Sequence, residues 1–196
     1  MGDFELMFEV CPPEGDTLDA LYANEDALLS THGTTTLVTM TSEGASALAA
    51  AKAAVGRLER LGFVVRRLYE DYVTRSEIAR RAGVTPQAVG LWARSERRNS
   101  NAPPFPEPCN FAGNSELWLW HDINGWLSHL AKGDGLKHPT WVDYVLTNEW
   151  LLSRATEIHA QHLADFPVRT KFSQAVSPSQ TSEMPSRTFA FGLVLT

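Results

Sequence analysis

The chain has 196 residues, of which 43% are hydrophobic and 20% are charged, so it is long enough to bury one or two hydrophobic cores. Its 17 Lys and Arg face 23 Asp and Glu, and the formal net charge of −6 excludes a wholly basic nucleic-acid protein. Cys11 and Cys109 stand far apart, which excludes a disulfide framework or a cysteine-rich zinc site and favours a reducing cytoplasm. The acidic N-terminus and the lack of a long apolar run predict neither secretion nor a membrane span.

Residues 1–71 predict a small α+β domain. In chain order we expect a strand over 4–10, a helix from residue 16 or 17 to Gly33, a strand over 34–41, an alanine-rich helix over 46–61 and a strand over 63–69. Alternation, apolar residues at helical spacing, and glycines as stops support these elements. The order of layers resembles part of a ferredoxin-like sandwich, a fold with too many uses to indicate a function.

Charge changes abruptly after this domain. Residues 66–98 hold eight arginines and four carboxylates, a net charge of +4, between two acidic flanks. Such an island is typical of a solvated helical face or of a local nucleic-acid contact.

Two short helices are predicted within the arginine island. Thr74 can cap a helix over 76–82, Gly83 supplies a tight turn, and Thr85 can cap a second helix with Pro86 at its first position. Apolar residues at the packing positions indicate a helix-turn-helix; they are Ile78, Ala79, Ala82, Val84, Val89 and Trp92.

The segment after these helices predicts a hairpin and two further helices. Prolines and asparagines over 99–108 are incompatible with regular structure, and a hairpin then turns at Gly113-Asn114. We expect helices over 121–130 and 140–163, separated by a Gly133-Asp134-Gly135 turn that lacks the context of a phosphate-binding loop.

This arrangement resembles the winged helix-turn-helix of the excisionase and MerR-type families over roughly residues 72–130. The resemblance rests on the run Phe105-Pro106-Glu107-Pro108, on Trp118-Leu119-Trp120, on Asp122 and on Trp126-Leu127. The preceding α+β domain is similar in layout to regulators of actinobacterial type. Wings of these families carry basic tips, whereas residues 112–116 are neutral to acidic, so the wing itself predicts no strong phosphate contact.

We therefore expect four parts: an α+β domain at 1–71, a winged helix-turn-helix at 72–131, a helical segment at 132–166, and a Ser/Pro/Thr-rich tail at 167–196 with a terminal strand-like stretch. The fold class is α+β. The predicted function is sequence-specific binding of double-stranded DNA, as a transcriptional regulator. The alternatives are an excisionase-like architectural or recombination accessory protein and an antitoxin-like interaction module, and a purely structural winged helix also stays open.

The helix beginning at Thr85 is predicted to enter the major groove. Gln87 suits adenine, Arg94 suits guanine or phosphate, and Leu91 suits a thymine methyl; Gly90 is predicted to face outward with them. Phosphate contacts are expected from the residues at the start of the first helix and just past the second. The complete predicted set is Arg75, Ser76, Thr85, Gln87, Leu91, Arg94, Arg97 and Arg98.

We expect a homodimer, because a winged helix with few basic residues gains affinity when two copies bind one DNA. The favoured interface is the late helix, which carries a stripe of Trp141, Val142, Val145, Leu146, Trp150, Leu151 and Ile158. An open edge of the N-terminal sheet at 4–10 is a second candidate, which residues 188–195 could cap instead. The stripe could also pack within its own chain.

Enzymatic chemistry finds little support in the sequence, and we expect no metal and no cofactor. His159 and His162 lie three apart without a carboxylate at matching spacing, and Cys109 has no obvious base beside it. A small effector or a protein partner stays open, with Trp141, Tyr144 and Trp150 as a candidate aromatic cage.

Overall fold

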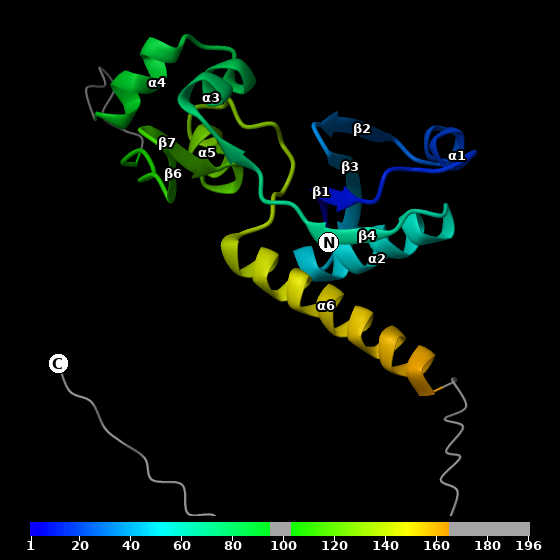
Figure 1. Ribbon diagram of the computed structural model, residues 1–196. Helices are drawn as coiled ribbons and strands as arrows, with labels where there is room; N and C mark the ends of the chain where they lie inside the picture. Colours follow the sequence, from blue (N-terminus) through cyan, green and yellow to red (C-terminus); the bar gives the residue numbers. More distant parts are fainter. Residues whose placement is uncertain (95–102, 165–196) are drawn as a thin grey trace, which may run out of the picture.

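The computed structural model describes residues 1–94 and 103–164, with side chains up to residue 155. The fold is α+β, and the described residues form two antiparallel sheets, each with its own hydrophobic core. We call residues 1–71 the first region and residues 72–131 the second region. In Figure 1 the two regions lie side by side, and the long helix α6 runs below the first.

The first region has the element order β-α-β-β-α-β, the order of the ferredoxin-like motif. Its elements are β1 (Gly2–Val10), α1 (Thr17–Asn24), β2 (Ala27–His32), β3 (Thr35–Gly44), α2 (Ala47–Arg60) and β4 (Val65–Leu68). The strands lie in the order β2-β3-β1-β4, and each neighbouring pair is antiparallel. The predicted open edge at 4–10 is therefore wrong, because β1 lies between β3 and β4.

Strand β1 shows why one face of this sheet is covered. Its even-numbered residues Phe4, Leu6, Phe8 and Val10 are buried in the first core, whereas the odd-numbered residues between them are partly exposed. Helix α2 packs on β3 with a row of alanines, and its N-cap Ser46 accepts a hydrogen bond from Ala49 N. These small side chains allow the helix to approach the sheet closely.

The helix predicted from residue 16 or 17 to Gly33 is wrong in its second half. Helix α1 ends at Asn24, and residues 27–32 form β2, which pairs along its whole length with β3. Gly33 then lies in the hairpin turn, with a left-handed φ of +61°. Hydrogen bonds to β3 thus override the helical spacing of Leu28 and Leu29, and Leu28 is 64% exposed.

The second region contains a three-stranded sheet and three helices. Its elements are β5 (Tyr72–Val73), α3 (Arg75–Ala82), α4 (Pro86–Ala93), β6 (Asn110–Ala112), β7 (Ser115–Leu119) and α5 (Trp120–Ser128). The strands lie in the order β5-β7-β6, so the hairpin β6–β7 joins the segment that precedes α3. The predicted helices and hairpin form at these positions.

Aromatic side chains dominate the second core. The Phe105 ring lies 4.9 Å from that of Trp126 and 5.9 Å from that of Trp118. Two proline carbonyls accept indole N–H hydrogen bonds of 2.9 Å, Pro106 from Trp118 and Pro103 from Trp126. Trp92, predicted on the buried side of its helix, is only partly buried, because its ring packs over Trp126 from outside at 5.1 Å.

Helix α6 (Trp141–Ala164) covers the edge of the first sheet. Thr140 and Asp143 form a reciprocal cap: Thr140 N donates to the carboxylate at 2.9 Å, and Asp143 N donates to the hydroxyl at 3.2 Å. The side chain of Asn148 accepts from Leu68 N at 2.7 Å and donates to Leu68 O at 3.1 Å. This amide satisfies the backbone of edge strand β4 as a neighbouring strand would.

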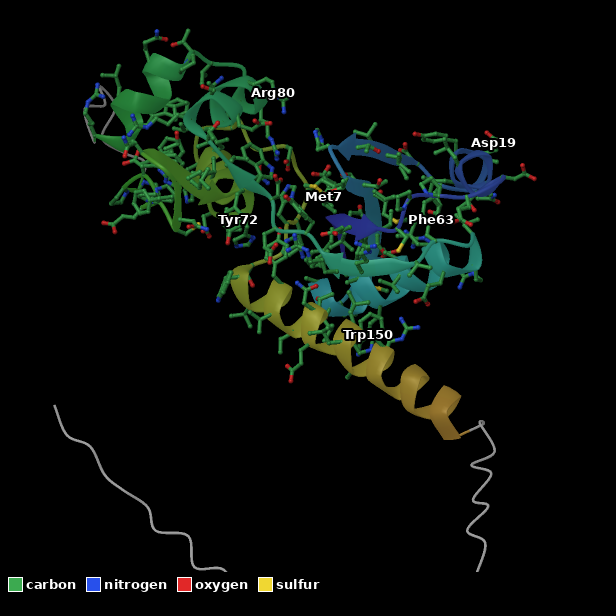
Figure 2. The ribbon with its side chains drawn as sticks, viewed as in Figure 1. Met7, Asp19, Phe63, Tyr72, Arg80 and Trp150 are labelled. Carbon is green, nitrogen blue, oxygen red and sulfur yellow. The ribbon has the colours of Figure 1, made fainter. Side chains whose placement is uncertain are left out.

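The predicted apolar stripe on α6 is divided between two faces. Leu151 is buried in the first core and Trp150 packs against it beside α2, where Lys52 Nζ lies 5.3 Å from its ring (Figure 2). The rest of the described stripe is exposed, namely Trp141, Val142, Val145 and Leu146. Intramolecular packing thus accounts for part of the stripe. The Ile158 side chain and the strand-like segment 188–195 lie outside what the structure describes.

No helix within the described residues has both the length and the apolar character that a membrane crossing requires.

Candidate nucleic-acid interface

Helix α4 is positioned by caps at its start and by a glycine turn before it. Gly83 has a left-handed φ of +66°, which reverses the chain after α3, and Val84 N donates to Ala79 O at 2.9 Å. Thr85 then caps α4, since its hydroxyl accepts from Ala88 N at 3.3 Å. Val89 is buried in the second core, and it therefore fixes which side of α4 faces that core.

The outer face of α4 presents the predicted base-reading residues. Gln87, Leu91 and Arg94 are exposed and lie at spacings of four and three, so they share one side of the helix. Thr85 is exposed too, although its hydroxyl is used for capping. Gly90, predicted to face outward, has little exposed surface. Among the described residues, the side chain that a Cβ at this position would contact is that of Arg94, with Nη1 at 3.5 Å, so Gly90 lies beneath Arg94 and not against the second core.

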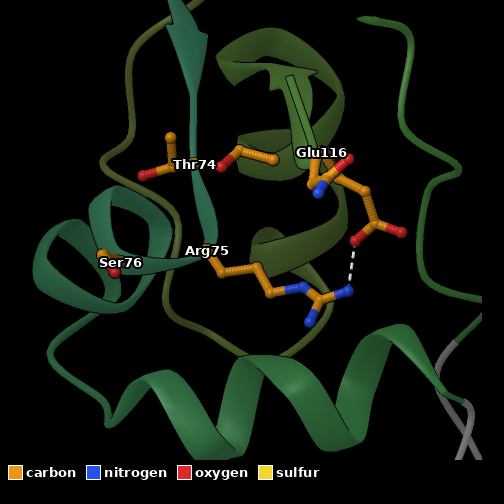
Figure 3. Close-up of a pocket in the computed structure, with 6 residues that line it drawn as sticks. Thr74, Arg75, Ser76 and Glu116 are labelled. Carbon is orange, nitrogen blue, oxygen red and sulfur yellow. Dashed lines mark hydrogen bonds and ion pairs between the residues drawn. The ribbon is translucent and has the colours of Figure 1, made fainter. Parts of the chain in front are cut away.

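Arg75 and Ser76 lie at the start of α3, exposed as predicted. With the tip of the hairpin they line a pocket of about 330 Å³ (Figure 3). Arg75 extends across this pocket and pairs through Nη2 with the carboxylate of Glu116 on β7. Arg97 and Arg98 lie outside the described residues.

Four other arginines of the island pair with carboxylates. Arg81 donates two hydrogen bonds to Asp71, of 2.6 and 2.8 Å, and its guanidinium lies 4.7 Å from the Trp120 ring. Burial opposes the charge of Arg81, but the bonds to Asp71 outweigh burial and raise its pKa. Arg80 pairs with Glu77 at 2.9 Å, and Arg66 and Arg67 pair with Glu9. Much of the island's charge is therefore neutralised within the protein.

A polar junction that the sequence did not indicate joins the second region to β1. Asp134, in the predicted glycine turn, accepts hydrogen bonds of 2.8–2.9 Å from Trp120, Asn124, Leu136 and His138. Burial alone would raise the pKa of Asp134, but these donors together with the nearby imidazole hold it below its usual range.

The backbone strengthens this junction. Lys137 N donates to Asp3 O at 3.0 Å and Glu5 N donates to Lys137 O at 2.9 Å. The buried imidazole of His138 lies 3.9 Å from the Glu5 carboxylate, and desolvation raises the pKa of Glu5. These contacts depend on residues more than 100 positions apart, so no local pattern could have revealed them.

The described residues that were candidates for a metal site, a nucleophile or an aromatic cage do not come together in the fold. Among the described residues no three His, Cys, Asp or Glu side chains gather closely enough to hold a metal ion, and the side chains of His159 and His162 lie outside them. Cys109 is exposed, with Sγ 3.6 Å from Leu117 O. The proposed aromatic cage is not formed, because Trp141 and Tyr144 line one groove while Trp150 packs beside α2.

Comparison of the chain with protein-family models, with curated proteins and with solved structures found no match.

Proposed function

We propose that the chain binds double-stranded DNA sequence-specifically, as a transcriptional regulator, and that α4 enters the major groove. The observation that carries this proposal is the exposed row Gln87, Leu91 and Arg94 on the second of two capped helices joined by a tight turn. The following hairpin β6–β7 pairs beside β5, and this pairing supports the proposed winged helix-turn-helix.

The side chains divide into base-reading and phosphate-binding groups. Gln87 suits the paired donor and acceptor of adenine, Arg94 suits guanine, and Leu91 suits the methyl group of thymine. Arg75 and Ser76 contact phosphates, and so do Arg97 and Arg98 by their sequence positions. The proposed activity needs no cofactor and no catalytic residue.

A second copy of the chain is the proposed partner at α6. Of the eleven large hydrophobic residues that are exposed in the described chain, five lie between Trp141 and Leu152 on this helix. Trp141, Val145 and Leu152 also line a groove of about 460 Å³. Exposed apolar patches of this kind mark interaction surfaces, and two copies would read two half-sites. Sedimentation at micromolar concentration tests it, because a monomer mass with and without palindromic DNA contradicts a dimer.

We place this function in the cytoplasm, since Cys11 and Cys109 are both free thiols and a DNA-binding protein needs access to the chromosome.

Selection from a random DNA library, followed by binding measurements on the full chain, tests the function. Arg94→Ala should cost about 1–3 kcal/mol on the selected sequence and relax the preference at one position. Arg60→Ala is the matched control, since Arg60 is an exposed arginine on α2 in the first region, and it should leave binding unchanged.

The alternatives give different results in the same experiment. Cooperative binding to tandem sites with strong bending favours an excisionase-like accessory protein. No measurable DNA affinity at low salt contradicts the proposal and favours an interaction module. Unchanged sequence preference in the double variant Gln87→Ala, Arg94→Ala means that α4 does not read bases.

A further inference from the structure

The pocket between α3 and the hairpin is lined mainly by hydrogen-bond donors. The Arg75 guanidinium, the hydroxyls of Ser76 and Ser115 and the side-chain amide of Asn114 border about 330 Å³. Among the described residues of the lining, Glu116 is the one that carries a carboxylate. Such a set of donors, provided by two separate elements, suits an oxyanion with several acceptor oxygens, such as a phosphodiester.

Glu116 already occupies the position that such an anion would take. Its carboxylate pairs with Arg75 across the pocket, as the dashed line in Figure 3 shows. Both side chains are partly exposed, Arg75 by 44% and Glu116 by 32%. An ion pair with this exposure adds little to stability, so the fold does not depend on it and it can exchange for another anion.

We propose that this pocket is a phosphodiester site closed by its own carboxylate. In the free protein Glu116 pairs with Arg75, and on DNA a phosphate oxygen replaces the carboxylate, whose side chain turns away into solvent. The proposal rests on the proposed function and deepens it. Glu116 thereby lowers the affinity for any DNA backbone and makes binding depend more strongly on the base contacts of α4.

Salt dependence distinguishes this role from a merely structural one. Each phosphate that a protein cation neutralises steepens the plot of log K against log salt concentration by about 0.9. In the wild type the displaced Glu116 leaves its negative charge near the phosphate, so Arg75 contributes little to that slope. Removal of the carboxylate should restore the full contribution.

The experiment measures binding of the full chain to a short duplex of random sequence between about 50 and 200 mM salt. Glu116→Gln should bind about fivefold more tightly at about 0.15 M salt and steepen the slope by about 0.9. Glu116→Ser should act in the same direction. Arg75→Ala should weaken binding, and in its background Glu116→Gln should gain nothing, as a double-mutant cycle requires for a direct pair.

Glu59→Gln is the matched control. Glu59 also pairs with a partly exposed arginine, Arg154 at 2.9 Å, but it lies on α2 in the first region. Its substitution releases an arginine with the same change in net charge and should leave DNA affinity unchanged.

The outcomes separate this proposal from the proposed function. If the wild type binds DNA but both Glu116 variants keep its affinity and slope, the closed pocket is overturned and the DNA-binding function stands. An equal gain in Glu59→Gln overturns the pocket as well, because net charge alone then explains the effect. If neither the wild type nor Glu116→Gln binds DNA at low salt, both proposals are overturned.

Discussion

The two regions of this protein build their cores in different ways. The first packs a helix of small residues on an alternating strand, so that Ala50, Ala54 and Leu58 are fully buried by regular elements. The second gathers Trp118, Trp126 and Phe105 around a segment without regular structure. Regular geometry thus holds the first core together, whereas the second depends on a few large rings and the carbonyls that accept their N–H groups.

Charge is arranged differently as well. In the first region Arg57 bonds to Glu25 at 3.1 Å and to Thr41 O at 2.9 Å, which ties α2 to the sheet. In the second region Arg81 serves a comparable structural purpose, but Arg75 bridges two elements at an open pocket. The role of an arginine in this chain therefore depends on whether its ion pair lies between packed elements or at an open pocket. Its position in the arginine island alone does not assign that role.

The largest expected effect tests the aromatic core. Trp118 is 1% exposed and donates to Pro106 O, so Trp118→Ala should lower the free energy of unfolding by about 3–5 kcal/mol. Leu58→Ala in the first region is its counterpart, with an expected loss of about 2–5 kcal/mol. Denaturant unfolding followed by tryptophan fluorescence and by far-UV circular dichroism measures both. Retention of wild-type stability in Trp118→Ala would contradict the dependence on large rings.

The link between α6 and the first sheet should be the next most sensitive. Asn148→Ala removes both bonds to the backbone of Leu68 and leaves a partly buried N–H and C=O without their partner, at a cost of about 1–3 kcal/mol. Thermal unfolding measures the loss. Glu149→Ala, at the neighbouring position, is the control and should change little; an equal effect of both would mean that helix propensity, not the amide, is responsible.

The junction at Asp134 should show a pH dependence. The pKa of Asp134 is lowered in the folded protein, so its contribution to stability is present above the unfolded value of about 3.9 and is lost as pH falls through the folded value. Asp134→Asn should therefore be less stable than the wild type at pH 7, by about 1–2 kcal/mol. This difference in stability should disappear on acidification, and urea unfolding at a series of pH values measures it. A difference that stays constant with pH would contradict the role of the ionised carboxylate.

The smallest effect compares helix caps in the two regions. Thr85→Ala and Ser46→Ala each remove a side chain that accepts from a backbone N–H three residues later, and each should cost about 1 kcal/mol. Thr85→Ser keeps the hydroxyl and should recover most of the loss. Because Thr85 caps α4, Thr85→Ala should also weaken DNA binding, whereas Ser46→Ala should not. Equal effects of the two variants on binding would mean that α4 is not part of the DNA-binding site.

Local signals in the sequence were enough for several elements. The caps Thr74 and Thr85, the turn at Gly83 and the hairpin at Gly113 lie where they were expected, because each depends on hydrogen bonds or φ angles within about four residues. The exposed row on α4 likewise follows from helical spacing once the buried Val89 is known.

Only the tertiary structure decided the rest. Residues 27–32 have helical spacing but form β2, since pairing with β3 satisfies their backbone. Arg75 meets Glu116 across 41 positions and Asn148 meets Leu68 across 80, and the acidic hairpin tip acquires its proposed role only through the first of these contacts. Sequence by itself determined where the chain turns and caps, because those interactions are local. Which charges face one another was decided by packing, because partners so far apart in the chain are brought together only by the folded arrangement of both regions.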